Sequence, residues 1–303
     1  MTEPEVVLAT PPETIERIVF LGTPDESSVA LRALVDAGFD LASVITQPDR
    51  RRGRGGRLDP SPVKRAAVDL GLDHERDVVH DLDGVLDLGA DLGVVVAYGR
   101  IIPTRILEVL PMVNIHFSLL PRWRGAAPVE RAILAGDTRT GVCLMEVAAG
   151  LDTGGVYARA EVDIDPEETA AELRARLAVL GADLLVEHLR TGLKPAEPQV
   201  GEATYAAKLE RDEFQLRFDR PAIELHRTVR LGRAWTWFRG KRLGVLAARL
   251  LPGSGEPGSL DGPVVSTPDG RLELVEVRPE GRRAQPAVDW LNGARPGRED
   301  RLG

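Results

Sequence analysis

The sequence lacks several features that define whole classes of protein. It has one cysteine among 303 residues, so no internal disulfide can form, and Cys143 is predicted to be a small core residue. It has no apolar run of about 18 residues, the length that a membrane-spanning helix needs. Residues 1–16 carry acids and prolines where a signal peptide has basic and apolar blocks. We therefore expect a cytoplasmic protein with residues 1–16 as a loose extension.

The fingerprint of a dinucleotide site is also absent. Residues 17–21 form an apolar run that predicts a first strand, and residues 27–37 follow with helical spacing. The turn between them reads Gly-Thr-Pro, whereas pyrophosphate-binding turns read Gly-x-Gly-x-x-Gly. The sequence therefore disfavours a nicotinamide or flavin cofactor.

The pattern that is present predicts two domains. At 43% hydrophobic and 28% charged, the chain can bury a sizeable core. Apolar runs alternate with helical spacing as far as residue 190, which predicts an α/β fold with a Rossmann-like, mostly parallel sheet over residues 17–191. The polar residues 192–210 are expected to be a linker. Short strand-like runs in residues 211–303 predict a small OB-like β-barrel.

Three polar side chains stand out in the first of these domains. Asn114 and His116 lie two residues apart in the apolar run 113–117, so on a strand they share a face. The strand ends just beyond them, and ligands of open α/β sheets bind at that edge. The run 141–147 leads to Asp152, which we expect to reach the same edge from a neighbouring strand. An amide, an imidazole and a carboxylate suit acyl chemistry, although a single strand histidine is more often a buried core residue.

The surrounding motif resembles that of a known family. Asn114 to Pro128 reads Asn-x-His-x-Ser-Leu-Leu-Pro-x-Trp-Arg-Gly-x-x-Pro, and Leu-Asp-Thr-Gly follows at residues 151–154. This resembles the signature of the formyltransferases that depend on 10-formyltetrahydrofolate, most closely the members that act on methionyl-tRNA. The resemblance implies 10-formyltetrahydrofolate as co-substrate, no metal, and the catalytic residues Asn114, His116 and Asp152. It also implies folate contacts from Ser118, Leu119, Leu120, Pro121, Tyr98 and Ile101.

A basic segment precedes these motifs. The predicted loop between residues 47 and 64 carries three glycines and five arginines, namely Arg50, Arg51, Arg52, Arg54 and Arg57. Mutual repulsion and glycine entropy predict a segment that an anionic partner orders, although a solvated linker has a similar composition. Similar loops occur in formyltransferases that act on tRNA, so the resemblance implies that the five arginines bind the acceptor stem of initiator methionyl-tRNA.

The C-terminal part is also basic. Residues 211–303 contain 17 Lys+Arg and 13 Asp+Glu, a balance of +4, within a chain of net charge -8. Such a basic region favours a polyanionic partner, although a solvated face is equally consistent with it. Its cations interleave with Trp235 and Trp237, which fit either a nucleic-acid surface or a barrel core. These cations are Arg227, Arg230, Arg233, Arg239, Lys241 and Arg242.

We therefore expect a monomeric enzyme that formylates the amino group of methionyl-tRNA for translation initiation. Residues 212–218 depart from the family pattern and leave the amine acceptor less certain, and Glu26 stands where the family has an aromatic residue that could shape the mouth of the site. The alternatives are an N-formyltransferase for a nucleotide-linked amino sugar, a catalytically weak RNA-binding paralogue, and a hydrolase of the formyl folate. The arginine segment argues against the first, the intact trio against the second, and the basic C-terminal part against the third.

Overall fold

The computed structural model describes residues 7–52, 57–72, 78–79, 82 and 84–303. The chain divides into two compact units. The first unit contains Met1–Pro128, Arg139–Val162 and Arg174–Ala206, and the second contains Val129–Thr138, Asp163–Leu173 and Ala207–Gly303. No helix among the described residues is long and apolar enough to cross a membrane.

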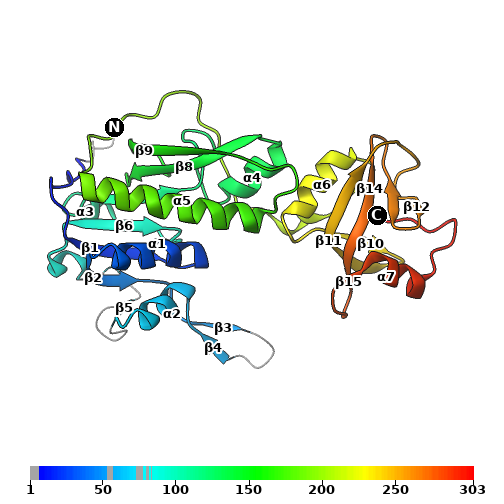
Figure 1. Cartoon of the computed structure of the whole chain (residues 1–303), viewed down its shortest axis with the longest axis horizontal. Helices are drawn as coiled ribbons and strands as arrows, with labels where there is room; N and C mark the ends of the chain where they lie inside the picture. Colours follow the sequence, from blue (N-terminus) through cyan, green and yellow to red (C-terminus); the bar gives the residue numbers. More distant parts are fainter. Residues whose placement is uncertain (1–6, 53–56, 73–77, 80–81, 83) are drawn as a thin grey trace, which may run out of the picture. The chain divides into compact units, whose positions relative to one another are not determined.

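A seven-stranded sheet forms the centre of the first unit (Figure 1). Its first five strands are parallel, and β8 then runs antiparallel to β7. In spatial order the strands are β5 (Val78–Val79), β2 (Asp40–Ile45), β1 (Arg17–Gly22), β6 (Leu92–Val96), β7 (Met112–His116), β8 (Arg139–Glu146) and β9 (Val156–Asp163). All residues of β6 are buried, as the continuous apolar run predicts. The predicted α/β class with a mostly parallel sheet is confirmed.

Several helices pack with this sheet, and the long helix α5 (Ala170–Thr191) covers one face of β7. The other helices that accompany the sheet are α1 (Asp25–Asp36), α2 (Pro62–Asp69), the 3-10 helix η1 (Val85–Leu88) and α3 (Thr104–Leu107). Gly181 of α5 lies so close to Ile115 of β7 that a Cβ atom there would be 2.6 Å from the Ile115 side chain. Because neighbouring strand residues point to opposite faces, α5 covers the face of β7 that does not carry Asn114 and His116.

The second unit contains an antiparallel sheet. Its strands are β10 (Trp235–Phe238), β11 (Lys241–Leu251), β14 (Arg271–Pro279), β13 (Val264–Ser266) and β12 (Leu260–Asp261) in spatial order, with β15 (Gln285–Pro286) beside β14. The C-terminal residues Arg301 and Leu302 bridge to Ser259 and Phe238, so they join the two ends of the sheet in a barrel-like arrangement. The helices of this unit are α4 (Pro128–Ala135), the 3-10 helix η2 (Arg211–Phe214), α6 (Ala222–Arg230) and α7 (Ala287–Ala294).

The structure differs from the sequence-based expectation in two segments. Part of the predicted basic loop is an antiparallel pair of short strands, β3 (Arg50–Arg52) and β4 (Arg57–Asp59). Arg230 was one of the cations considered for a nucleic-acid surface, but it lies on α6 with 8% exposure and donates to the carbonyl oxygens of Glu168 and Asp165 at 2.8 and 2.9 Å. The Arg230 guanidinium therefore forms hydrogen bonds within the second unit and is not available at its surface.

Candidate functional site

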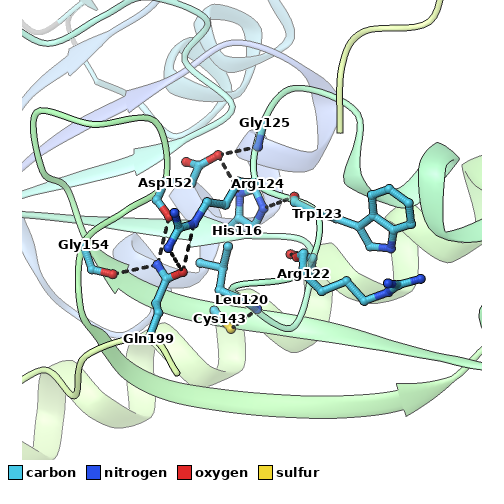
Figure 2. A network of polar contacts seen from close by, with 11 residues as sticks. His116, Leu120, Arg122, Trp123, Arg124, Gly125, Cys143, Asp152, Gly154 and Gln199 are labelled. Carbon is cyan, nitrogen blue, oxygen red and sulfur yellow. Dashed lines mark hydrogen bonds and ion pairs between the residues drawn. The ribbon is translucent and has the colours of Figure 1, made fainter. Parts of the chain in front are cut away.

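His116 ends β7 at the carboxyl edge of the sheet, and contacts on both sides fix its ring (Figure 2). The side chain is only 5% exposed. Its Nε2 atom lies 2.9 Å from the carbonyl oxygen of Trp123, and its Nδ1 atom lies 3.6 Å from Oδ2 of Asp152. A ring with both nitrogens facing defined groups has little rotational freedom, as acid-base chemistry requires.

The contact with Trp123 assigns the tautomer of His116. A backbone carbonyl can only accept a hydrogen bond, so Nε2 carries a hydrogen and donates it. In the neutral ring Nδ1 is then the nitrogen with a free lone pair, and it is the atom that faces Asp152. A distance of 3.6 Å is too long for a direct hydrogen bond but allows an ion pair once the imidazole is protonated. Any proton that His116 exchanges therefore passes through Nδ1.

Asp152 reaches His116 by a route that differs from our expectation. Because β8 is antiparallel to β7, with Val113 opposite Glu146, the carboxyl end of β8 lies beside the beginning of β7. Residues 147–155 therefore turn back toward the carboxyl end of β7. Asp152 adopts a left-handed backbone conformation with φ of 51° within this segment, and its Oδ2 atom accepts a hydrogen bond of 2.7 Å from the backbone N–H of Gly125.

Asn114 completes the trio on the same face of β7. It is partly buried and pairs in register with Val95 of β6 and Met145 of β8, so its backbone is fixed by strands on both sides. Because Asn114 and His116 lie two residues apart on the same strand, their side chains point to the same face of the sheet. The structure thus places an amide donor, an imidazole and a carboxylate along one edge.

The predicted folate-contacting loop is largely held by its own side chains. Ser118 is fully buried and donates to the carbonyl oxygen of Arg122 at 2.5 Å, and Leu120 packs with Cys143 in a small buried cluster. Leu119 is partly buried, and the peptide bond between Leu120 and Pro121 is cis. A ligand contact at Ser118 or Leu120 would therefore come from the backbone. The predicted core position of Cys143 is confirmed.

Tyr98 and Ile101 have opposite environments. The Tyr98 ring is 2% exposed and packs in the core beneath the sheet edge, whereas Ile101 is 91% exposed. A cavity of about 310 Å³ lies against the backbone of residues 97–99 and is also lined by Thr23, Gln47 and Ser61. It lies where β1, β2 and β6 end, which is the same edge of the sheet as the one where His116 ends β7, although none of the trio lines it.

Two further features answer questions that the sequence raised. Glu26, which stands where the family has an aromatic residue, forms an ion pair with Arg174 of α5 at 3.0 Å. It does not line this cavity. Among the five arginines of the basic segment, Arg50, Arg51, Arg52 and Arg57 lie on the β3–β4 pair, while Arg54 falls outside the described residues.

Sequence reasoning missed Gln199, and it left open whether Arg124, which belongs to the motif, is structural or faces a ligand. The Gln199 side chain donates to the carbonyl oxygens of Asp152 and Gly154, and its own oxygen accepts from Arg124 (Figure 2). Gln199 lies 47 residues beyond Asp152, in the predicted linker, so no local pattern links the two.

Cations gather at one place in the second unit. The Arg242 guanidinium lies 4.4 Å from the ring centroid of Trp235, which is buried, whereas Trp237 is 38% exposed. Arg233, Arg278 and Arg282 line the same cavity of about 210 Å³. Partial burial, and then the nearby charges of Arg211 and Arg278, lower the pKa of Arg242. Glu280 in the same cavity opposes this effect, but it is one carboxylate beside four arginines, so the excess of positive charge favours an anionic ligand.

The fold and the trio define an α/β enzyme suited to acyl transfer, and comparison with known proteins identifies which kind. A sequence profile described as formyl transferase matches residues 16–189, and a profile of the formyl transferase C-terminal domain matches residues 208–295. The chain belongs to the formyl transferase family.

Similar proteins agree with this assignment. A methionyl-tRNA formyltransferase of Paracoccus denitrificans is 46% identical over 297 residues, covering 94% of this chain and 100% of the relative. One of Halorhodospira halophila is 48% identical over 304 residues, covering 92% and 96%. The crystal structure of HypX from Aquifex aeolicus in complex with tetrahydrofolic acid has a TM-score of 0.65 at 18% identity, covers 94% of this chain and 48% of that chain, and supports the fold alone.

Proposed function

We propose that this chain transfers the formyl group of 10-formyltetrahydrofolate to the amino group of initiator methionyl-tRNA in the cytoplasm, for translation initiation. The observation that carries the proposal is the convergence of His116 and Asp152 at the sheet edge, with Asn114 on the same strand face. The methionyl-tRNA specificity is supported by relatives that are 46% and 48% identical over more than nine-tenths of this chain.

The chemistry requires three groups. The amine nitrogen forms a bond to the formyl carbon, whose carbonyl electrons move onto oxygen, and the bond from that carbon to N10 then breaks. One proton leaves the amine and one arrives at N10. The Asn114 amide donates to the negative oxygen, His116 exchanges protons through Nδ1, and Asp152 stabilises the imidazolium that results. This transfer needs neither metal nor redox cofactor.

Binding of the tRNA is assigned to two basic regions. Arg50, Arg51, Arg52, Arg54 and Arg57 contact phosphates of the acceptor stem, and the residues 211–303 form a tRNA-binding domain. Guanidinium groups match phosphate geometry and supply affinity that depends on salt concentration. We propose that the protein works as a monomer.

One assay separates this function from the alternatives. The purified protein is given 10-formyltetrahydrofolate with methionyl-tRNA, with a nucleotide-linked amino sugar, or with no acceptor, and both formyl transfer and folate release are measured. We expect rapid formation of formylmethionyl-tRNA only with the first acceptor. Faster transfer to the amino sugar, or equal folate release without an acceptor, would overturn the proposal in favour of the sugar enzyme or the hydrolase.

Charge reversal tests the basic segment separately. Replacing Arg50, Arg51 and Arg52 by glutamate should weaken the reaction of methionyl-tRNA, and most strongly at low salt, where phosphate contacts contribute most. The affinity for 10-formyltetrahydrofolate in the absence of tRNA serves as the control, because binding of the folate does not involve the phosphates. An unchanged KM for tRNA at low salt would contradict a role for these arginines.

A further inference from the structure

A segment far along the chain lies beside the candidate site. Residues 197–206, which we call the strap, are anchored at both ends. Glu197 exchanges two backbone hydrogen bonds with Val156, at 2.8 and 2.9 Å. Farther along, the backbone N–H of Arg124 donates to the Thr204 carbonyl oxygen at 2.8 Å, and the carbonyl oxygen of Arg124 accepts from the Ala206 N–H at 2.6 Å. The strap thus spans the distance between the Asp152 segment and the loop that carries Trp123 and Gly125.

Gln199 is the side chain of the strap that joins these two loops (Figure 2). Its Nε2 atom donates to the carbonyl oxygens of Asp152 and Gly154, both at 2.8 Å. Its Oε1 atom accepts from Nε and Nη2 of Arg124 at 3.1 and 2.7 Å. Two carbonyls on one side and a guanidinium on the other fix which end of the amide faces which loop.

The Asp152 turn needs such support. A non-glycine residue in the left-handed region persists only where surrounding contacts fix it, and Asp152 has φ of 51°. Gln199 holds the carbonyl of Asp152 itself and the carbonyl two residues later, so it fixes the backbone on both sides of Thr153. The same turn sets the direction of the Asp152 carboxylate, which contacts Gly125 N–H at 2.7 Å and faces His116 at 3.6 Å.

We propose that Gln199 is a positioning residue that holds the Asp152 carboxylate against His116 through its hydrogen bonds to the Asp152 turn. The inference rests on the proposed function for its rate effect. The effect of Gln199 on the direction of the Asp152 carboxylate does not depend on which acceptor the enzyme uses.

Two substitutions at Gln199 divide its contacts. Gln199→Glu keeps an oxygen that accepts from Arg124 but removes both hydrogens that reach the Asp152 turn, whereas Gln199→Ala removes every contact. Both should lower kcat on the order of 10- to 100-fold, because small displacements of a catalytic group cost this much. The KM values for methionyl-tRNA and for the formyl folate should stay within about twofold of wild type, since no substrate contact is lost. Glu202→Gln, an exposed change in the same strap, is the matched control.

A double substitution shows whether the effect passes through Asp152. In an Asp152→Ala background, Gln199→Ala should lower kcat no further, because the carboxylate that it positions is gone. A full additional loss in that background would overturn the inference, as would wild-type kcat in Gln199→Glu. A loss expressed only in KM would also overturn it.

A spectroscopic readout works without any turnover. The amide of Gly125 donates to the Asp152 carboxylate, so its proton resonance in an ¹⁵N–¹H spectrum reports the position of that carboxylate. We expect the Gly125 signal to shift in Gln199→Glu and to stay in place in Glu202→Gln. If wild type fails to formylate methionyl-tRNA, the proposed function is wrong, whereas an unshifted Gly125 signal in Gln199→Glu shows that the positioning inference is wrong.

Discussion

Among single residues, His116 is held in the orientation that matters most for the proposed chemistry. The Trp123 carbonyl accepts from Nε2, which leaves Nδ1 as the nitrogen that can take up or release a proton. The carboxylate of Asp152 lies 3.6 Å from that atom, and in the proposed mechanism it stabilises the imidazolium. His116 is buried, its Nε2 atom donates to a backbone carbonyl and its Nδ1 atom faces a carboxylate, so proton exchange takes place at Nδ1.

The first prediction concerns the trio. Asn114→Ala, His116→Ala and Asp152→Ala should each lower kcat for formylation of methionyl-tRNA by about two orders of magnitude or more, as loss of single oxyanion donors and acid-base groups does. Initial rates at saturating substrates measure the effect. Asn292→Ala on the exposed surface of α7 serves as a control for fold and handling. Near-normal rates in all three variants would contradict the assignment.

The sequence motif named the three residues of the proposed trio, but it did not predict how they come together. Asn114 and His116 follow from strand alternation, because residues two apart share a face. The position of Asp152 does not, since β8 runs antiparallel to β7 and only the turn of residues 147–155 returns the carboxylate to the site. The role of Gln199 could not be predicted either, because its side chain contacts a segment 47 residues earlier in the chain.

At the scale of elements, the last residues of the chain complete the sheet of the second unit. Leu302 is 2% exposed within the core cluster of this unit, and its backbone N–H donates to Gly258 at 2.9 Å. Its carbonyl oxygen lies so close to Gly258 that a Cβ atom there would be 2.2 Å away. Glycine at position 258 is therefore a requirement of this closure.

The second prediction tests that closure. Leu302→Ala should lower the free energy of unfolding of the second unit by about 2–5 kcal/mol, because it removes a buried leucine and leaves a cavity. Urea denaturation measures the change. Val288→Ala, at a site that is 53% exposed, should cost far less. Equal effects of the two substitutions would show that the C-terminal residues do not belong to the core.

The third prediction concerns pH. Hydrogen bonds from Arg239, and then from the N–H of Gly297, lower the pKa of Asp300 to about 2 from its ordinary value of 3.8. The pKa is lower in the folded state, so the contribution of Asp300 to stability is present above pH 3.8 and disappears as pH falls toward 2. Asp300→Asn should therefore lower the melting temperature modestly at neutral pH, and the difference should shrink as the pH approaches 2. An exposed change, Asp261→Asn, provides the comparison in thermal unfolding. A difference that does not depend on pH would contradict the linkage.

Most strands of the sheets could be predicted from apolar runs, whereas α6 could not. The buried face of α6 includes His226 and Arg230, whose polar groups are satisfied by residues 163–173. A search for hydrophobic periodicity counts such residues as exposed, so the helical pattern is hidden. The β3–β4 pair was missed because the arginine content pointed to an irregular loop.

At the scale of the whole molecule, charge is divided unevenly along an acidic chain. The net charge is -8, yet residues 211–303 carry a balance of +4. Within the second unit, Arg242 stacks on Trp235 near Arg211, Arg233 and Arg278, whose charges help lower its pKa. An anionic ligand such as a tRNA phosphate would relieve this repulsion.

The fourth prediction follows from that cluster. Arg242→Ala should weaken tRNA binding and reduce the slope of log affinity against log salt concentration by about 1, as loss of one phosphate contact does. Arg249→Ala on the same strand is the matched control, because Arg249 is paired with Glu273 at 3.5 Å. Identical slopes for wild type and Arg242→Ala would show that Arg242 does not contact a tRNA phosphate.

The role of Asp152 in formyl transfer is tested by a single-turnover measurement of formylmethionyl-tRNA formation by wild type and by Asp152→Ala, with enzyme in excess over methionyl-tRNA. We expect rapid formylation by wild type and a rate constant lower by about two orders of magnitude or more in the variant, with tRNA affinity retained. Equal rate constants, or no formylation by wild type, would contradict this role.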